Sequence, residues 1–243
     1  MLKISIYSFF IYRIALYFLF TYNFFMDKSP DNIKKMFNDI ASSYDFNNMV
    51  ISFGLHKLVK KKVVKSIDFS GNVLDLCTGT GDIAGLISNN YKCNVIGLDF
   101  SIEMLKIAKN RYAHIDFIEG DCTNLPFANE SFDFVTISFG LRNIENYDKA
   151  LDEIYRVLKP NGKFIHLDFG KKNPIANVIY NFIVPKLVSI FYKNLVPYDY
   201  LVKSKKLFFD ETQLISLFEK HLFNKVKTKS YLLGGISCQV MQK

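Results

Sequence analysis

The stretch "NVLDLCTGTGDIAGLI", residues 72–87, decides the fold of this chain. An apolar strand-like run leads into a glycine turn, and an apolar helix-like run follows the turn. Gly79, Gly81 and Ala84 fit the G-x-G-x-x-G/A spacing of nucleotide-binding turns, because glycines permit a tight turn and let the backbone approach a ligand. The spacing alone does not identify that ligand.

Strand and helix patterns alternate from this turn onward. A strand over Val73–Cys77 precedes a helix over Asp82–Ser88, and a strand over Asn94–Leu98 precedes a helix that Ser101 opens and that runs through Asn110. The rhythm continues through "IDFIEGD" (115–121), "FDFVTISF" (132–139), a helix over 146–158, a turn at 159–162, "KFIHLDF" (163–169), a helix over 211–220, and two closing strands within 224–233 and 236–241. The pattern predicts an α/β fold with a doubly wound, mostly parallel seven-stranded sheet.

Residues 26–67 and 171–209 are additions to this domain, which we place at 68–243. After Pro30, apolar residues at helical spacing predict one helix, and a second apolar set around 58–64 predicts another. The intervening "SSYDFNNMVISFGLHK" (42–57) is typical of a loop-rich lid. The insertion at about 171–209 is rich in aromatic residues, which suits either simple helix packing or an apolar wall of a substrate cavity.

The first 25 residues are apolar over nearly the length that crosses a bilayer, with Arg13 in the middle. Three interpretations compete: a membrane anchor, a targeting sequence, or upstream sequence joined to a gene that starts at Met26. The excess of Phe, Tyr and Ile and the polar start "MDKSPDNIKKMF" at Met26 favour the third.

Charge and cysteine content narrow the class of protein. The formal charge is +8, and lysines crowd into "HKLVKKKVVKS" (56–66), which suits an anionic partner or simply a solvated helix face. The four cysteines form no C-x-x-C pair and have no histidine at zinc-ligand spacing. We therefore expect no metal site and no disulfide framework.

The predicted strand ends carry the residues that select a ligand. Asp99 ends the second strand, eighteen residues after Gly81, where a carboxylate can accept hydrogen bonds from ribose hydroxyls. Asp75 lies just before the glycine turn, where it disfavours a pyrophosphate and suits a ligand with an ammonium and a sulfonium. Asp121 and Cys122 follow the third strand, where they can meet an adenine or simply cap a turn.

Together these features resemble a class I S-adenosylmethionine-dependent methyltransferase, a Rossmann-like fold, over residues 68–170. "TISFGLRNI" (136–144) is similar to the quinone-biosynthesis C-methyltransferases, which act on demethylmenaquinol or on the polyprenyl-benzoquinol precursor of ubiquinone. Similar too are "FNDIASSYDFNN" (37–48), "SFGLH" (52–56), "YRVLKPNGKF" (155–164), "PYDYLVKS" (197–204) and "LLGGIS" (232–237). Val59 departs from the Trp of the family's first motif, and Asn161 and Asp168–Gly170 depart from its second. The turn beginning Cys77-Thr78-Gly79 is closer to the naphthoquinone-type members.

The resemblance implies a methyltransferase that uses S-adenosylmethionine and no metal. The residues implied in cofactor binding are Asp75, Gly79, Thr80, Gly81, Asp99, Asp121, Cys122 and Ser138. Arg142 is the catalytic candidate, stabilising a phenolate or polarising a water, with Asn143 orienting the contact; the alternative is a surface arginine paired with Glu145. His56 is the alternative base, or else makes a structural hydrogen bond.

The implied substrate is a polyprenylated quinol, and its tail suggests peripheral contact with a membrane surface. Five lysines can rest on anionic lipid: Lys57, Lys60, Lys61, Lys62 and Lys65.

We expect no nucleic-acid partner, since no basic module interleaved with aromatics is evident. Self-association or a quinone-biosynthesis complex is compatible with the sequence. The implied location is cytoplasmic at the inner membrane in a bacterium, or the matrix or stromal face of an organelle inner membrane. Another small-molecule or RNA methyltransferase, and a non-catalytic subunit, are the rival functions.

Overall fold

A computed structural model of the chain describes residues 29–171 and 196–243, with side chains of the second range described from Tyr200. The apolar segment at 1–25 and most of the predicted insertion lie outside the described residues. Among the helices of the two described ranges, none has the length and apolarity needed to cross a membrane.

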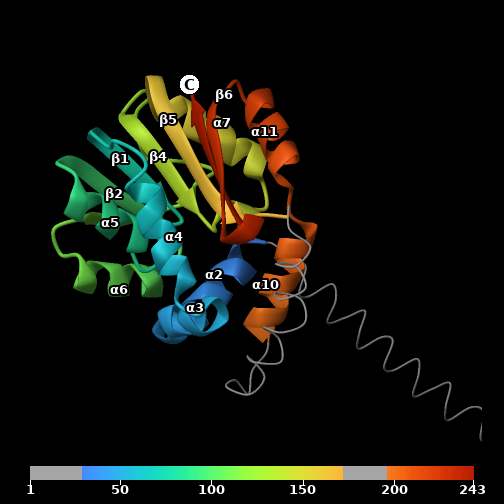
Figure 1. Ribbon diagram of the computed structural model, residues 1–243. Helices are drawn as coiled ribbons and strands as arrows, with labels where there is room; N and C mark the ends of the chain where they lie inside the picture. Colours follow the sequence, from blue (N-terminus) through green and yellow to red (C-terminus); the bar gives the residue numbers. More distant parts are fainter. Residues whose placement is uncertain (1–28, 172–195) are drawn as a thin grey trace, which may run out of the picture.

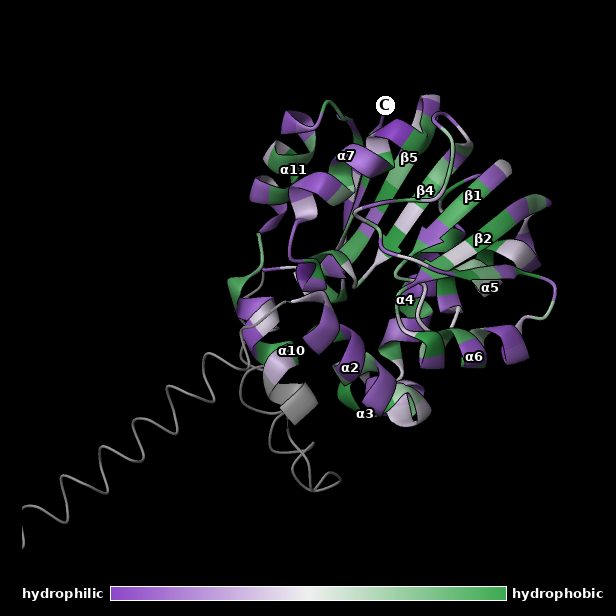
Figure 2. Ribbon diagram, turned by 180° about the vertical axis from the view of Figure 1, so that it is seen from behind, coloured by the Kyte–Doolittle hydropathy of each residue, from purple (hydrophilic) through white to green (hydrophobic). Residues whose placement is uncertain are grey.

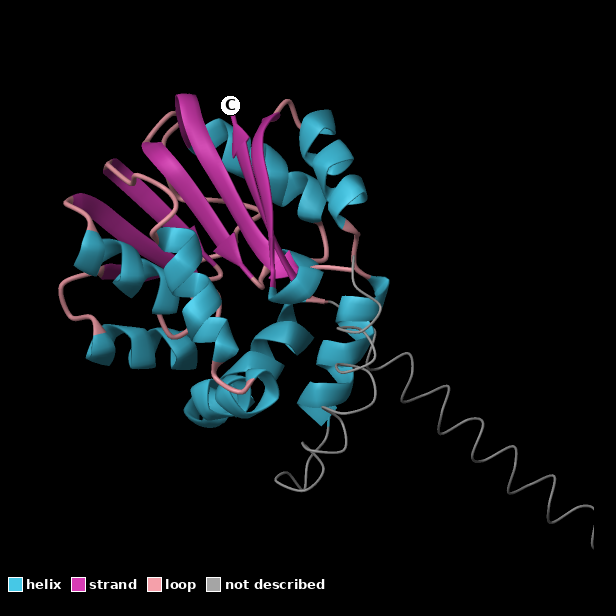
Figure 3. Ribbon diagram, in the orientation of Figure 1, coloured by secondary structure: helices cyan, strands magenta, loops and turns pink. Residues whose placement is uncertain are grey.

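The core is a seven-stranded sheet in the order β3-β2-β1-β4-β5-β7-β6 (Figures 1 and 3). Strand β7 is antiparallel to both of its neighbours, and the remaining pairs are parallel. The strands are β1 Gly71–Leu76, β2 Cys93–Asp99, β3 Asp116–Glu119, β4 Phe132–Ser138, β5 Leu158–Phe169, β6 Asn224–Tyr231 and β7 Ile236–Gln242. The doubly wound, mostly parallel sheet predicted from the sequence is thus confirmed.

Helices cover both faces of this sheet, because successive side chains along a strand point to opposite faces and apolar side chains on both faces are buried. Val73 packs with helices α4, α5 and α6, whereas its neighbour Leu74 packs with α7 and α11 on the opposite face. Figure 2 shows the apolar strands between helices whose outer surfaces are largely polar. The α-helices are α2 Pro30–Ile40, α3 Tyr44–Ser52, α4 Leu55–Val64, α5 Asp82–Asn90, α6 Ile102–Arg111, α7 Tyr147–Val157, α10 Val196–Leu207 and α11 Glu211–Lys220.

The starts of α6, α7 and α11 follow capping signals in the sequence. The Ser101 hydroxyl accepts a hydrogen bond from Met104 N at the start of α6, and the Asn146 side chain accepts one from Lys149 N at the start of α7. Asp210 and Gln213 form a reciprocal capping box on α11. These caps fix the residues at which α6, α7 and α11 begin.

Two local predictions were wrong. The segment predicted as a loop-rich lid contains a short 3-10 turn, η1 Ala41–Ser43, followed by helix α3. The predicted turn at residues 159–162 falls within the range of β5, where Asn161 adopts φ 64° and the register with β4 shifts. Tertiary contacts decide the first segment, because α3 packs on α4 and on η1, and strand pairing decides the second, because Leu158 and Lys163 on either side of the turn both pair with β4.

Helices α2, α3 and α10 lie beyond the carboxyl ends of the parallel strands (Figure 1). This edge of an open α/β sheet is where ligands bind. Two further 3-10 turns, η2 Leu141–Asn143 and η4 Leu232–Gly234, lie in the chain next to that edge, after β4 and before β7. The polar residues at the strand ends therefore lie between the sheet and helices α2, α3 and α10.

Candidate active site

A cavity of about 250 Å³ lies between the carboxyl edge of the sheet and the N-terminal helices. Strand ends and the loops after them form one side, and side chains of α2 and α3 form the other. Its lining includes Pro30, Phe37, Tyr44, Cys77, Gly79, Asp99, Phe100, Asp121, Cys122, Ser138, Phe139, Asn143 and Glu145. Five of the predicted cofactor residues thus meet in one cavity: Gly79, Asp99, Asp121, Cys122 and Ser138.

The glycine turn supplies the floor of the cavity between β1 and α5. Gly79 has φ 56°, and a Cβ at this position would meet no atom within 4 Å, so the backbone faces open space. Gly81 has φ 81° and forms the N-cap of α5. Thr80 is buried, and its hydroxyl donates to Asp45 Oδ1 at 2.9 Å instead of lining the cavity.

Asp99 ends β2 with its carboxylate held from two sides. Its Oδ2 accepts a hydrogen bond from Gly79 N at 2.8 Å, and its Oδ1 accepts one from Ser101 N at 2.9 Å. Each carboxylate oxygen retains a lone pair for a further donor. Burial raises the pKa of Asp99 to about 6, although these backbone donors oppose the shift. The position fits the predicted acceptor for ribose hydroxyls.

Asp75 lies beneath the glycine turn and outside the cavity lining. Its carboxylate accepts from the hydroxyls of Thr78 and Thr136, each at 2.6 Å, and from Ala84 N at 3.2 Å. Burial raises its pKa to about 6 despite these donors. The structure therefore places Asp75 as a brace that ties β1, β4 and α5 together, where we had predicted a direct ligand contact.

Asp121 lines the cavity and also closes its own turn. Its two oxygens accept from Thr123 N and Thr123 Oγ1, both at 2.8 Å. Cys122 is buried beside Cys77, and contact between these thiols, together with burial, raises the pKa of Cys77 well above its usual range. All four cysteines are free thiols. Asp121 therefore caps its own turn and also lines the cavity.

Ser138 and Asn143 form the wall after β4. Ser138 Oγ is buried and has no hydrogen-bond partner among the residues that the structure describes. Asn143 Nδ2 donates to Phe139 O at 3.3 Å, and Asn143 Oδ1 accepts from the hydroxyl of Tyr200 at 3.1 Å. Tyr200 belongs to α10, so this bond fixes the amide from across the cavity edge. Nothing local in the sequence predicted the partnership, because 57 positions separate the two residues.

Arg142 is buried, and its partner differs from the one the sequence suggested. Its Nη1 donates to Asp168 Oδ1 at 2.9 Å and to Phe139 O at 2.6 Å, and its guanidinium carbon lies 5.1 Å from the centroid of Phe169. The surface pair with Glu145 is therefore wrong. The side chain is absent from the described cavity lining, and Arg142 and the cavity share Phe139 as a common neighbour.

His56 also lies off the described cavity lining, on the inner side of α4. Its Nδ1 is 2.5 Å from Ser52 Oγ, which in turn donates to Asn48 O at 2.6 Å. Burial, reinforced by the neighbouring Lys60 ammonium, lowers the pKa of His56 to about 4, so the ring is neutral near pH 7. This geometry matches the structural hydrogen bond that we weighed against a role as base.

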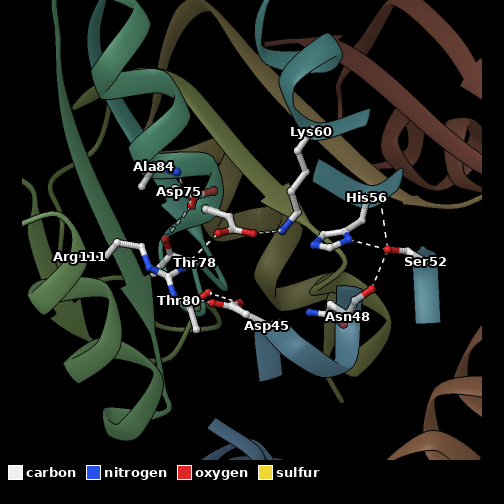
Figure 4. A network of polar contacts seen from close by, with 11 residues as sticks. Asp45, Asn48, Ser52, His56, Lys60, Asp75, Thr78, Thr80, Ala84 and Arg111 are labelled. Atoms are coloured by element: carbon white, nitrogen blue, oxygen red, sulfur yellow. Dashed lines mark hydrogen bonds and ion pairs between the residues drawn. The ribbon is translucent and has the colours of Figure 1, made fainter. Parts of the chain in front are cut away.

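A chain of polar contacts missed by the sequence analysis joins the N-terminal helices to the glycine turn (Figure 4). Arg111 Nη2 lies 2.6 Å from Asp45 Oδ2, and Arg111 Nη1 lies 3.4 Å from Asp82 Oδ1. Lys60 Nζ lies 3.1 Å from Asp82 Oδ2, and its side chain is 12% exposed. Lys60 is thus engaged within the protein and is not available to lipid.

The fold and the cavity define a class I S-adenosylmethionine-dependent methyltransferase. A solved S-adenosylmethionine-dependent methyltransferase from Thermotoga maritima, described as a possible histamine N-methyltransferase, has a TM-score of 0.64 and 21% identity, covering 86% of this chain and 99% of that one. At this identity the likeness shows the fold alone. The substrate class has to come from sequence relatives.

The chain belongs to the ubiE/COQ5 methyltransferase family, whose profile matches residues 25–243. A demethylmenaquinone methyltransferase from Leptospira interrogans is 42% identical, covering 87% of this chain and 92% of the relative. A ubiquinone/menaquinone biosynthesis C-methyltransferase UbiE from Rickettsia bellii is 36% identical, covering 84% and 89%. The family resemblance found in the motifs is confirmed.

The residues at the cavity fit S-adenosylmethionine, the methyl donor of this class. Ser138 Oγ is a buried polar atom that lacks a partner within the described residues, and Asp99 has acceptor capacity left. Gly79 lines the cavity and presents its backbone to open space. Gly79, Asp99, Asp121, Cys122 and Ser138 would hold the cofactor.

Proposed function

We propose that this chain transfers a methyl group from S-adenosylmethionine to a ring carbon of a polyprenylated quinol in menaquinone or ubiquinone biosynthesis. The names of the relatives from Leptospira interrogans and Rickettsia bellii support this reaction. Demethylmenaquinol is the first substrate to test, because the relative at 42% identity is named for it. The 2-methoxy-6-polyprenyl-1,4-benzoquinol is the second, because the Rickettsia relative is named for both pathways.

The observation that carries the proposal is the two-sided lining of the cavity. Strand ends and the loops after them supply Gly79, Asp99, Ser138 and Phe139 on one side, whereas α2 and α3 supply the aromatic side chains Phe37 and Tyr44 on the other. An aromatic ring packs favourably against such side chains, in offset or edge-to-face arrangements. The aromatic side chains thus suit a planar quinol and the strand ends suit a polar nucleoside, and a transfer between the two requires them to lie next to each other.

The protein's residues have to stabilise negative charge on the quinol. When bound, S-adenosylmethionine supplies a methyl group on a sulfonium centre. The ring carbon becomes nucleophilic when the adjacent hydroxyl loses its proton, and the proton on that carbon leaves after the new bond forms. Asn143 lines the cavity with an amide held by Tyr200, so it can orient the ring hydroxyl. The Arg142 cation, held by Asp168, favours the phenolate through its field.

Methyl transfer from labelled S-adenosylmethionine to each of the two quinols tests the proposal. The reduced quinols, presented in detergent, should accept label on a carbon, whereas the oxidised quinones should not, because they lack the phenolic hydroxyl. Label in another small molecule or in RNA, with neither quinol methylated, would assign a different methyltransferase. A folded protein that binds S-adenosylmethionine and methylates nothing would favour a non-catalytic subunit.

The proposal includes peripheral contact with a membrane, because the substrate tail is apolar. It places the enzyme at the cytoplasmic face of the inner membrane in a bacterium, or at the matrix or stromal face of an organelle inner membrane. Self-association or assembly with other quinone-biosynthesis proteins is compatible with it. Cell fractionation followed by blotting of the membrane fraction tests the location.

A further inference from the structure

Large apolar side chains are exposed on the outer face of α3 and the start of α4. Phe46 and Met49 follow helical i, i+3 spacing on α3 and are 54% and 43% exposed, and Phe53, the left-handed residue that caps the end of α3, is 66% exposed. Leu55 and Leu58 continue this surface onto α4, at 38% and 57% exposed. We call these five residues the α3–α4 apolar surface. Clustered exposure of this kind marks an interaction site, whereas single exposed apolar residues are ordinary.

The two helices cannot bury this surface by turning, because their inner faces are occupied. On α3, Tyr44 lines the cavity and Asp45 bonds to Arg111 and Thr80. At the junction with α4, Ser52 bonds to His56. Figure 4 shows the Asp45 side chain directed toward Thr80 and Arg111, and the Ser52 side chain directed toward His56. The apolar surface therefore faces outward in the folded protein, and no described residue covers it.

Positive charge accompanies the apolar side chains. Lys57, Lys61, Lys62 and Lys65 are exposed on α4, and residues 46–67 contain no Asp or Glu. Lys60 is not one of these exposed lysines, because it forms an ion pair with Asp82. Aromatic and aliphatic side chains beside lysines, without acidic residues, form the pattern of a helix that lies on an anionic bilayer.

We propose that the α3–α4 apolar surface and its four lysines dock the protein on anionic lipid. Phe46, Met49 and Phe53 enter the headgroup region, and the lysines pair with lipid phosphates and carboxylates. The docking surface lies close to the cavity, since Tyr44 on the same helix lines the cavity only two residues from Phe46. Docking on this face brings the cavity next to the bilayer. The inference rests on the proposed function only in identifying the tail of the quinol as the reason for docking.

Vesicle sedimentation with the full-length protein tests the docking surface. Vesicles of phosphatidylcholine are compared with vesicles containing phosphatidylglycerol, at low and at physiological salt. Phe46→Ser/Phe53→Ser and Lys61→Glu/Lys62→Glu should each weaken binding to the anionic vesicles by about tenfold or more, because apolar contact and lysine attraction both contribute. Added salt should weaken vesicle binding by the wild-type protein to about the level of the Lys61→Glu/Lys62→Glu variant, because salt screens the attraction between lysines and lipid.

Matched control variants lie at the opposite edge of the sheet. Leu222 and Val226 are 67% and 50% exposed, and Lys225 and Lys227 are exposed on β6. Leu222→Ser/Val226→Ser and Lys225→Glu/Lys227→Glu should therefore leave vesicle binding within twofold of wild type. Thermal melting of every variant establishes that each is folded.

Two results would overturn the docking surface: wild-type vesicle binding by both α3–α4 variants, or equal losses in the matched controls. Sedimentation velocity without lipid tests whether a second copy of this chain covers the surface instead. If Phe46→Ser/Phe53→Ser abolishes self-association and leaves vesicle binding unchanged, the surface is a self-association interface. Methyl transfer to a quinol analogue with a short, water-soluble tail should be unchanged in the α3–α4 variants. Failure of that transfer in the wild-type protein would count against the proposed function and leave the lipid result standing.

Discussion

Arg111 Nη2 lies 2.6 Å from Asp45 Oδ2, which joins the end of α6 to the start of α3 across 66 positions of sequence. The same Asp45 carboxylate accepts the hydroxyl of Thr80 in the glycine turn at 2.9 Å. One aspartate therefore connects the helix that bears Tyr44 to the loop that would hold the cofactor. The geometry indicates that Arg111 and Asp45 position the N-terminal helices over the cavity.

Removal of this contact should weaken cofactor binding more than catalysis. The Arg111 and Asp45 side chains are 38% and 28% exposed, so their pairing contributes only about 0–1 kcal/mol after solvent screening. We expect Arg111→Gln and Asp45→Asn to raise the dissociation constant for S-adenosylmethionine about threefold to fivefold, with kcat nearly unchanged. Calorimetry and steady-state kinetics measure the two effects.

Lys106→Gln is the control for Arg111→Gln, because Lys106 forms an exposed pair with Glu103 on the same helix. Limited proteolysis gives a second readout, since loosened N-terminal helices should be cut faster in the Arg111 variant than in the control. Unchanged affinity and unchanged cleavage in both Arg111→Gln and Asp45→Asn would contradict a positioning role.

The affinity for S-adenosylmethionine should fall as the pH drops through about 6. Burial raises the pKa of Asp99 to about 6, and the ionised carboxylate is the better acceptor for ligand hydroxyls. The effect on folding has the opposite sign. A carboxyl group with a raised pKa contributes stability below its unfolded value near 4, and that contribution is lost as the pH rises to about 6.

Calorimetric titration from pH 5 to 8 measures this dependence, and Asp99→Asn should weaken binding and flatten the profile. Asp75 has a similar raised pKa and lies outside the cavity lining, so Asp75→Asn is the matched comparison. A profile that Asp99→Asn leaves unchanged and that Asp75→Asn abolishes would move the titration to the brace beneath the turn.

The parallel sheet and the strand-end residues were predictable because they depend on short-range patterns. Apart from Asp75, Val73–Cys77 is apolar; Gly79 and Gly81 follow it, and Asp99 ends the next strand, so local periodicity and turn chemistry place them. The α3 helix was not predictable in the same way. Its polar residue Asp45 is typical of a loop until its partners Thr80 and Arg111 on other elements are known.

Long-range partners account for the rest of the site. Arg142 was singled out from its motif, but its ion pair with Asp168 joins β5 to the turn after β4, and no pattern in the sequence specifies that choice over the nearby Glu145. The sequence likewise does not show which of the lysines on α4 pairs with Asp82; in the structure it is Lys60. Pairings of this kind are set by sheet register and helix packing, which the local sequence does not encode.

Deletion of residues 1–25 should leave a folded enzyme with normal affinity for S-adenosylmethionine. The described cavity lining runs from Pro30 to Lys149, and the α3–α4 apolar surface begins at Phe46. Transfer to a detergent-solubilised quinol should therefore stay within twofold of the full-length protein. A truncated protein that melts normally but no longer methylates the quinol would show that the segment takes part in the reaction.

Tyr200→Phe should lower the transfer rate by freeing the amide of Asn143. The hydroxyl donates to Asn143 Oδ1 at 3.1 Å, and such a bond contributes about 0.5–1.5 kcal/mol, which corresponds to a rate loss of roughly twofold to tenfold. Tyr155→Phe is the control, since Tyr155 packs on Phe223 away from the cavity. If Asn143→Ala and the double variant are equally slow, the tyrosine acts through the amide; additive losses would indicate an independent role.

Arg142→Ala should lower the rate of methyl transfer by a factor of roughly 10²–10³ while scarcely changing cofactor affinity, because the lost interaction develops with the phenolate. Single-turnover transfer with saturating cofactor and quinol measures the rate. The substitution also leaves Asp168 buried without its partner, which costs about 3–5 kcal/mol of stability. Rate and folding therefore have to be separated before the loss is attributed to chemistry.

The double variant Arg142→Met/Asp168→Leu separates them, since an apolar pair of similar volume can replace a buried ion pair with little loss of stability. We expect the double variant to melt near the wild-type temperature and to remain as slow as Arg142→Ala. Arg142→Lys should rescue the rate poorly, because the ammonium lacks the planar guanidinium that lies 5.1 Å from the Phe169 centroid while Nη1 bonds to Phe139 O and Asp168. A double variant that is both stable and within a few fold of the wild-type rate would show that Arg142 only supports the fold.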